Sequence, residues 1–388
     1  MGIKLKIDPR NLLLVAISTM FSLGALEILL RIIFSTNQSY LMKESFDQSF
    51  LVENEFWKVW HYPNSKTTHK KDCFEVTYIT NQWGMHDDAA NLIKDSTKTR
   101  IVLLGDSFVE GFGVSQNENF SSLLDSIHSD RLEILNFGLS GGIGTVHELA
   151  LYENLARHFN PDLVLLFYLN YNDLYDNNKA IDEGLVSKNL ELTYHTSNLN
   201  EVLKAINEKT IPKTSNSIIQ NSYCLSLAKK GARVFSSFLQ TAINIKADFK
   251  RSLSDNYDPS ESKNISNGYK IVTKSLQRLD SLVKLDSSKL VVIQLPDPYQ
   301  VDKNWISYSA QKFDQKLDPI YPNKKIKGIC DSLNIGYFDM YPRASRYIEE
   351  NKLSFPYFSQ TCDRHPSKFG HQYIATEVDR IIKSELEQ

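Results

Sequence analysis

The first long apolar run of the chain lies close to its N-terminus. Apolar residues extend from Leu12 to Phe34, and charge interrupts them only at Glu27 and Arg31. A bilayer core needs about 20 such residues. Glu27 and Arg31 lie four positions apart, so on a helix they share a face and can form an ion pair. The pattern predicts an uncleaved transmembrane helix; a cleaved signal peptide and a buried core helix are the alternatives.

Basic residues lie on only one side of this run. Lys4, Lys6 and Arg10 precede it, whereas residues 35–40 after it carry no basic charge. Positive charges flanking a membrane helix stay on the cytoplasmic side. The sequence therefore predicts a cell-membrane protein with a single span, residues 1–36 forming a cytoplasmic start and an anchor. The N-terminus is then cytoplasmic and everything after about residue 36 extracytoplasmic.

Residues 37–97 form a connecting segment between this anchor and the main domain. The segment is polar and irregular in pattern, with one strand-like stretch, FEVTYIT, followed by NQWGMHDD. We expect it to pack on the domain that follows.

From residue 98 onward, short apolar runs alternate with helical stretches. The runs are IVLL, LEILNF, DLVLLFY, LVVIQL and IGYFDMY. Buried strands with helices between them predict an α/β fold, here a three-layer, flavodoxin-like, doubly wound sheet of about five parallel strands. The alternation stops at about residues 179–289, where we expect an insertion with a helix near 218–249 and then a Ser-, Asn- and Asp-rich linker. The predicted domain is thus 98–388 with this insertion.

The composition excludes several classes of function. Lys and Arg number 44 against 46 Asp and Glu, a net charge of −2, so binding of nucleic acid by bulk charge is not expected. No nucleotide-binding glycine pattern and no metal-ligand spacing is evident, so neither a cofactor nor a metal is expected. The cysteines are far apart and leave one or two disulfides possible; they are Cys73, Cys224, Cys330 and Cys362.

Candidate catalytic residues follow the first three predicted strands. Ser107 lies in GDSF after the first strand, Gly141 in NFGLSGG after the second, and Asn172 in NYND after the third. In a sheet of order 2-1-3-4-5 the first strand lies between the other two, so Ser107 would emerge between Gly141 and Asn172. A serine in this place is a candidate nucleophile.

A nucleophilic serine needs a base and donors for the oxyanion that forms. The C-terminal sequence Asp363-Arg364-His365 supplies His365 as the base and Asp363 to orient it. The backbone N–H groups of Ser107 and Gly141, with the side-chain amide of Asn172, can form the oxyanion hole.

These four sequence blocks resemble those of the SGNH hydrolases, also called GDSL esterases and lipases. That family carries Ser, Gly, Asn and His in this order, and the resemblance covers residues 98–388 apart from the insertion. Asn170 departs from it, because the third block of the family has glycine there. The D-x-H spacing, the anchor and TNQWGMHDD are similar to membrane-anchored bacterial members that act on exported polysaccharides. The similarity implies structural roles for Asn81, Gly84 and His86.

Two residues offer alternative assignments. Ser140 lies in G-x-S-x-G, the pattern of the nucleophile in α/β-hydrolases, but this would leave GDSF and NYND unexplained. His371 is a second histidine near the C-terminus, which we expect to be a helix-start or supporting residue rather than the base.

Three functions are consistent with these residues. The first is a serine esterase or deacylase that acts through an acyl-enzyme on an acylated glycan or lipid outside the cytoplasm. The second is an O-acyltransferase that modifies a surface polysaccharide and takes its acyl group from a membrane partner protein. The third is a membrane-anchored glycan-binding protein without catalysis. Each would contact the membrane through Leu12 to Phe34, and none would bind nucleic acid.

Overall fold

The computed structural model describes residues 9–33, 51–71, 73–170, 172–208, 224, 254–353 and 359–387. The chain divides into two units, one made of Met1–Ser45 and Lys213–Ala247 and the other of Phe46–Pro212 and Asp248–Gln388. The helix expected near 218–249 lies outside the described residues, apart from residue 224.

The first unit contains the helix α1, Pro9–Ile33. Leu13–Ile33 has a mean hydropathy of 2.1 over 21 residues, long and apolar enough to cross a membrane, although a signal sequence would also satisfy this criterion. Arg31 Nε donates to Glu27 Oε1 at 3.0 Å, so the predicted ion pair is present. Lys4, Lys6, Phe34 and residues 35–40 lie outside the described residues.

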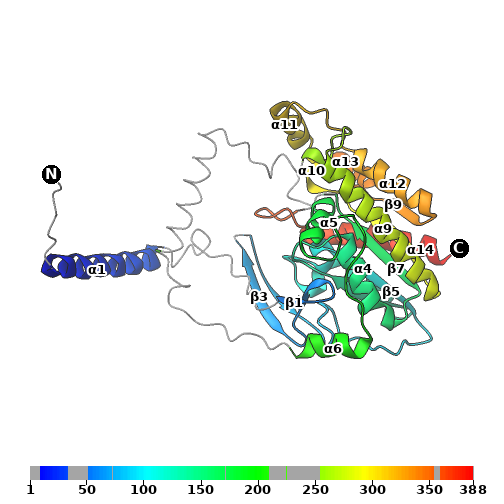
Figure 1. Ribbon diagram of the computed structural model, residues 1–388, viewed down its shortest axis with the longest axis horizontal. Coiled ribbons are helices and arrows are strands. Elements are labelled where there is room, and N and C mark those ends of the chain that lie inside the picture. Colours follow the sequence, from blue (N-terminus) through cyan, green and yellow to red (C-terminus); the bar gives the residue numbers. More distant parts are fainter. Residues whose placement is uncertain are drawn as a thin grey trace. The chain divides into compact units, whose positions relative to one another are not determined.

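The second unit contains a five-stranded parallel sheet, of which β5, β7 and β9 are labelled in Figure 1. The strands follow the order β6-β5-β7-β8-β9. Its strands are β5 (Thr99–Gly105), β6 (Leu132–Gly138), β7 (Leu163–Tyr168), β8 (Lys289–Gln294) and β9 (Gly336–Asp339). They coincide with the five apolar runs of the sequence, and in chain order the arrangement is 2-1-3-4-5. The predicted fold class is therefore confirmed.

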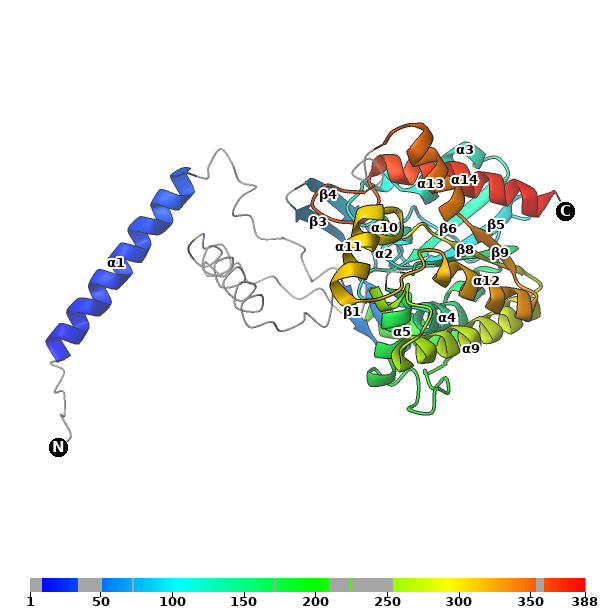
Figure 2. The same ribbon diagram turned by 90° about the horizontal axis from the view of Figure 1, so that it is seen from above.

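Helices cover both faces of this sheet, as the view in Figure 2 shows. Alternate residues of β5 point to opposite faces. Ile101 and Leu103 belong to the apolar cluster that includes α3 and α14, whereas Val102 and Leu104 belong to the cluster that includes α4, α9 and α12. The helices of this unit are α2 (Ser107–Glu110), η3 (Gln116–Glu118), α3 (Phe120–His128), α4 (Thr145–Asn154), η4 (Ala156–Phe159), α5 (Asp173–Asp182), α6 (Leu199–Asn207), α9 (Lys263–Leu285), α10 (Pro298–Val301), α11 (Lys303–Phe313), α12 (Tyr321–Leu333), α13 (Tyr341–Glu350) and α14 (Lys368–Leu386).

The expected insertion at 179–289 needs correction at its C-terminal end. Ser262 caps α9 by accepting a hydrogen bond from the Ile265 N–H, so a long helix begins inside the stretch interpreted as a linker. Its apolar face, which includes Val272 and Leu276, is buried in the same cluster as α4. This helix therefore belongs to the layers of the α/β unit. The insertion that interrupts the alternation of strands and helices is shorter than the sequence suggested. The sequence does not distinguish this cap from a linker residue, because serine is common in both.

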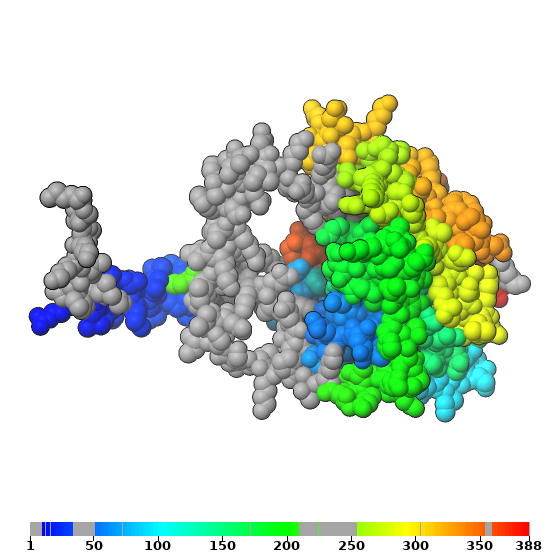
Figure 3. All heavy atoms as spheres, viewed as in Figure 1, coloured from blue at the N-terminus to red at the C-terminus, as the bar shows by residue number. Residues whose placement is uncertain are grey.

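The connecting segment is more ordered than its polar pattern suggested. It forms two antiparallel hairpins rather than one strand, made of β1 (Leu51–Asn54) with β2 (Lys58–His61) and β3 (Lys66–Lys71) with β4 (Phe74–Ile79). Phe56, between β1 and β2, stacks on the ring of His195 with the ring centroids 5.4 Å apart. In the space-filling view the residues near 51–61, in blue, accordingly lie against the green residues of the main body (Figure 3).

Candidate active site

Ser107 is placed by the end of β5 and the short helix α2. The strand is almost wholly buried and ends at Gly105. Asp106 then caps α2, because its side chain accepts a hydrogen bond from the Phe108 N–H at 2.9 Å. Ser107 is the first residue of α2, and Gly111 ends the helix with φ +87°, a conformation that favours glycine. The serine is thus held at the carboxyl edge of the sheet.

The turn after β6 lies beside this helix. Gly138 pairs with Gly105 in the parallel register, and a Cβ atom on Gly138 would lie only 2.1 Å from the backbone N of Glu110. Only glycine allows β6 to approach α2 so closely. Gly141 follows with φ +122°, and a Cβ atom there would approach Val59 Cγ1 to 2.9 Å. This places Gly141 in the turn of the strand next to β5, as the strand order predicted.

Asn172 follows β7 on the other side of β5. Its Nδ2 donates to Asp106 Oδ2 at 2.8 Å, so the amide lies against the residue immediately before Ser107. An amide nitrogen carries two N–H groups, and this contact uses one of them. The described residues therefore include Ser107, Gly141 and Asn172 at the ends of three adjacent strands, which is the arrangement expected from the sequence.

Asp363 and His365 lie on a loop of residues 359–366, named here the DRH loop. The loop is a small hairpin in which the Gln360 N–H donates to the His365 carbonyl at 2.9 Å. It leads into α14, which Ser367 caps through the Gly370 N–H. His365 Nε2 lies 2.8 Å from Ser107 Oγ, and His365 Nδ1 is hydrogen-bonded to Asp363 Oδ1. The structure thus joins all three predicted triad residues in one hydrogen-bonded chain.

The protonation state of Asp363 determines the direction of these hydrogen bonds. Burial alone would raise the pKa of Asp363, but hydrogen bonds from His365 and Lys71 and the positive charge of Lys71 lower it below its usual range. An ionised carboxylate can only accept a hydrogen bond, so Nδ1 of His365 carries the ring proton and donates a hydrogen bond to Asp363 Oδ1. Nε2 is then the acceptor for the Ser107 hydroxyl. This is the tautomer that a general base for Ser107 requires.

Two phenylalanine rings hold the imidazole of His365. The Phe112 ring lies 4.2 Å from it, centroid to centroid, and the Phe108 ring lies 5.3 Å from it. Both phenylalanines come from the segment that begins at Ser107, and the Phe112 N–H donates to the Ser107 carbonyl at 3.0 Å. The imidazole of His365 therefore packs directly on the segment that begins at Ser107.

The two alternative residues lie in different surroundings. Ser140 is buried beside Glu110. His371 is buried too, where its Nδ1 accepts from the Phe120 N–H at 3.3 Å and its ring stacks on that of Phe120. Burial lowers the pKa of His371 to about 3, which keeps it neutral. Neither residue contacts the other, and among the described residues the histidine next to Ser107 is His365.

Buried carboxyl groups lie behind the ends of β5 and β7. They are Asp106, Glu148, Asp173 and Asp176. Burial raises the pKa of each, and mutual repulsion adds to the effect, so that the pKa of Asp176 reaches about 7. Asp173 accepts from the Leu169 N–H at 2.8 Å and so fixes the turn that presents Asn172. Within the described residues, no group of three or more His, Cys, Asp and Glu side chains has an arrangement that could hold a metal ion.

Sequence analysis missed several residues of the site. The Lys71 Nζ atom lies 2.5 Å from Asp363 Oδ2, and Cys73 is disulfide-bonded to Cys362. Cys224 and Cys330 are free. The one available signal was the position of Cys362 directly before Asp363, which suggests a covalent restraint on the loop but does not identify the partner cysteine. Nothing in the sequence marked Lys71 or Phe112.

Comparison with known proteins finds similar solved structures. No protein-family model and no curated protein matches the chain. One similar structure is a putative lipolytic protein of the G-D-S-L family from Desulfitobacterium hafniense, with 11% identity, a TM-score of 0.37, and coverage of 73% of this chain and 99% of that chain. Another is the lipase/acylhydrolase from Enterococcus faecalis, with 12% identity, a TM-score of 0.37, and coverage of 74% and 96%. A third is a catalytic mutant of an acetylxylan esterase from Geobacillus stearothermophilus, with 11% identity, a TM-score of 0.38, and coverage of 74% and 95%. Because these identities and TM-scores are low, the roles of residues in this chain rest on its own geometry.

Proposed function

We propose that this chain is a serine esterase of the SGNH hydrolase type, which cleaves ester bonds through an acyl-enzyme. The observation that supports this most strongly is the hydrogen-bonded chain from Ser107 through His365 to Asp363. It joins residues 258 positions apart in sequence at the carboxyl edge of a parallel sheet, which is where such folds bind ligands. Gly141 and Asn172, which follow the two flanking strands, are the remaining two motif residues.

In the first half of the proposed reaction, Ser107 Oγ attacks the carbonyl carbon of the ester. The hydroxyl proton passes to His365 Nε2, and Asp363 stabilises the imidazolium that results. The negative charge that develops on the carbonyl oxygen is received by the backbone N–H groups of Ser107 and Gly141 and by the second N–H of Asn172. The C–O bond to the alcohol then breaks, and His365 donates its proton to the departing oxygen.

In the second half, water takes the place of the alcohol. His365 Nε2 accepts a proton from the water as its oxygen attacks the acyl carbon, and the same donors hold the second oxyanion. The bond to Ser107 Oγ breaks, the serine recovers its proton from His365, and the carboxylic acid leaves. A glycan hydroxyl in place of this water would make the reaction an acyl transfer.

We place the reaction outside the cytoplasm, on an acylated glycan or lipid. The α1 helix offers a single membrane span, and Lys4, Lys6 and Arg10 before it favour a cytoplasmic N-terminus. The Cys73–Cys362 disulfide supports the same location, because disulfides persist in oxidising compartments and are rare in the cytoplasm. The glycan rather than the lipid is favoured by the motif similarity to polysaccharide-processing proteins.

The first experiment measures hydrolysis of p-nitrophenyl acetate by the full chain in detergent. Ser107→Ala is expected to lower the rate by about 10⁴-fold or more, because the nucleophile is lost. Ser140→Ala is the matched control, since this serine lies on the neighbouring strand end and is not part of the triad; it should keep the wild-type rate. The reverse result would assign the nucleophile to Ser140 and reject the proposal.

A second experiment addresses the substrate. Acetate release is measured from O-acetylated polysaccharide and from acylated lipid, each with and without an added unacylated glycan as acceptor. An esterase on glycans should release acetate from the polysaccharide at a rate that the acceptor does not change. Acyl groups that appear on the acceptor would instead identify an O-acyltransferase, and release from the lipid alone would exclude the glycan.

A further inference from the structure

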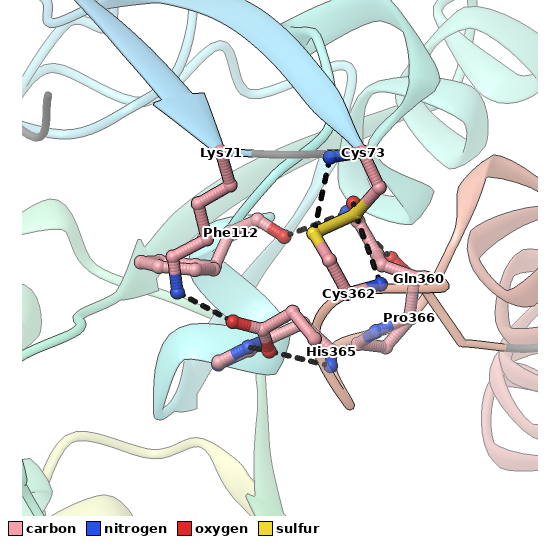
Figure 4. The surroundings of a disulfide bond; sticks show 8 residues. Lys71, Cys73, Phe112, Gln360, Cys362, His365 and Pro366 are labelled. Atoms are coloured by element: carbon pink, nitrogen blue, oxygen red, sulfur yellow. Dashed lines mark hydrogen bonds and ion pairs between the residues drawn. A yellow bond between two sulfur atoms is a disulfide. The ribbon is translucent and has the colours of Figure 1, made fainter. Parts of the chain in front are cut away.

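The β3–β4 hairpin reaches the DRH loop from outside the parallel sheet. β3 ends at Lys71 and β4 begins at Phe74, and these two residues face each other across the hairpin register. Figure 4 shows the Lys71 side chain directed from the end of the strand toward the DRH loop, beside the disulfide. The hairpin thus brings a cation to the triad that the four sequence blocks do not include.

Lys71 contacts the triad member that orients the base. The two oxygens of Asp363 have different partners: Oδ1 accepts from His365 Nδ1 and from the His365 backbone N–H at 3.1 Å, while Oδ2 accepts from Lys71 Nζ at 2.5 Å. The side chains of Lys71 and Asp363 are only 20% and 14% exposed. Solvent screens such a pair less than it screens a surface ion pair, and the second contact prevents the carboxylate from rotating.

A covalent link fixes the distance between the same two elements. Cys73, two residues after Lys71, is bonded to Cys362, one residue before Asp363, with the two Cα atoms 5.5 Å apart. Hydrogen bonds from the backbone N–H groups of Cys73 and Cys362 to the partner sulfur atoms, each 3.2 Å long, accompany the bond. The hairpin end and the DRH loop cannot separate while this disulfide is intact.

Phe112 adds a third contact between hairpin and base. Its ring lies 4.6 Å from the ring of His69 in β3, 4.9 Å from Lys71 Nζ and 4.2 Å from the ring of His365. His69 is fully buried, so this stack belongs to the interior rather than the surface. The Phe112 ring, which belongs to the segment that begins at Ser107, therefore contacts both the hairpin and His365.

We propose that Lys71 is a positioning residue for the reaction: it holds the Asp363 carboxylate in the orientation that keeps His365 in its base tautomer, and the Cys73–Cys362 disulfide maintains the register of that contact. This inference rests on the proposed function, because it assigns Lys71 a part in the same triad. Lys71 acts through Asp363 and makes no contact with the Ser107 hydroxyl.

The test is a double-mutant cycle between Lys71→Met and Asp363→Asn, measured by hydrolysis of p-nitrophenyl acetate. In the wild-type background Lys71→Met should lower kcat by about 10- to 100-fold and leave KM nearly unchanged, since the base is misplaced while the substrate site is kept. In the Asp363→Asn background the same change should alter kcat by less than about two-fold, because the Asp363 carboxylate through which Lys71 acts on His365 is already gone. An equal loss in both backgrounds would refute the proposal.

Two further variants separate positioning from general damage. Lys71→Arg retains the positive charge and N–H donors, so it should recover most of the lost kcat. Lys70→Met removes the neighbouring lysine, which pairs with Glu75, and should keep the wild-type kcat. If Lys71→Met fails to fold, Lys71→Gln takes its place in the cycle. A Lys70→Met variant as impaired as Lys71→Met would overturn the assignment.

A spectroscopic readout keeps this test independent of esterase activity. In ¹⁵N-histidine NMR spectra, His365 of the wild-type chain should show a protonated Nδ1, and Lys71→Met should weaken this signal or mix it with the other tautomer. An unchanged spectrum would refute the role of Lys71. A wild-type chain that shows the Nδ1 signal and its response to Lys71→Met, but hydrolyses no ester, would reject the proposed function while supporting the positioning role.

Discussion

Ser107 and His365 reach the same site from two regions that are built differently. Ser107 lies at the end of β5, between β6 and β7 in the sheet, where the parallel register and the close approach at Gly138 hold the strand ends. His365 lies on the DRH loop, outside the sheet, where a disulfide, an ion pair and aromatic packing restrain it. Ser107, the proposed nucleophile, is positioned by the sheet, whereas His365, the proposed base, is positioned by cross-links outside the sheet.

The carboxyl groups of the two regions are shifted in opposite directions. At the strand ends, burial raises the pKa of Asp106, Asp173 and Asp176. In the DRH loop, Lys71 and His365 lower the pKa of Asp363. Burial at the strand ends thus disfavours the charged form of these carboxyl groups, whereas the neighbours of Asp363 in the DRH loop favour its charged form.

Asp363→Asn should be the most damaging change in the DRH loop apart from loss of the base itself. An amide in this place can donate to His365 Nδ1, which would put the imidazole proton on Nε2 and prevent it from accepting the Ser107 proton. We expect kcat for ester hydrolysis to fall on the order of 10⁴-fold. Asp302→Asn is the control, because Asp302 lies close to Arg364 of the DRH loop but outside the triad. This variant should keep nearly the wild-type rate. Equal effects of the two changes would contradict the triad assignment.

Asn172→Ala tests the strand-end region. Loss of one oxyanion donor should lower kcat about 10²- to 10³-fold with little change in KM. Asn170→Ala is an informative comparison, because Asn170 is buried and hydrogen-bonded to Asn323 and Gln294. Its loss should lower the melting temperature clearly while kcat per folded molecule changes little. An unchanged kcat in Asn172→Ala would mean that another donor serves the oxyanion.

Reduction of the Cys73–Cys362 disulfide tests the cross-links. Freed from the hairpin, the DRH loop should lose its restraint, and kcat should fall about 10-fold or more because the base is misplaced. The free energy of unfolding should also decrease by about 2–5 kcal/mol. Hydrogen exchange should increase in residues 359–366 and remain unchanged in β5.

The double variant Cys73→Ser/Cys362→Ser is the control for this reduction. It should show the same loss without reductant and no further response to it. Full activity in this variant would mean that the fold alone holds the base, and the contrast between the two regions would disappear.

The smallest expected effect concerns pH and stability at the strand ends. The pKa of Asp176 is about 7 in the folded chain, above the value of about 3.9 in an unfolded chain, so the folded state binds the proton more tightly. Its contribution to stability is therefore complete below about pH 4 and is lost as the pH rises through 7. Asp176→Asn should therefore change the melting temperature more favourably at pH 8 than at pH 5, by a few °C. A difference of the opposite sign would contradict the raised pKa.

The sequence was sufficient for the strand-end region because its signals are local. Each strand is a short apolar run, and each motif follows directly after one, so the order 2-1-3-4-5 brought Ser107, Gly141 and Asn172 together without further information. The triad partners on the DRH loop were expected from the need of a nucleophilic serine for a base and from the resemblance of DRH to a family motif. Nothing in that motif specifies how the loop is held.

The restraints on the loop could not be predicted because they join distant and unremarkable residues. Lys71 is one of two adjacent lysines, and which of them faces Asp363 depends on the register of the β3–β4 hairpin. β3 itself has a polar sequence, KTTHKK, with no strand-like apolar pattern. The pairing of Cys73 with Cys362 spans 289 positions and is one of several that four cysteines allow.

The most direct test of the account is the site of covalent labelling by a fluorophosphonate. The full chain in detergent is treated with the probe, digested, and mapped by mass spectrometry, with His365→Ala treated in parallel. The account predicts an adduct on Ser107 in the wild-type chain, much slower labelling in His365→Ala, and no adduct on Ser140. An adduct on Ser140, or a folded wild-type chain that takes no label, would contradict it.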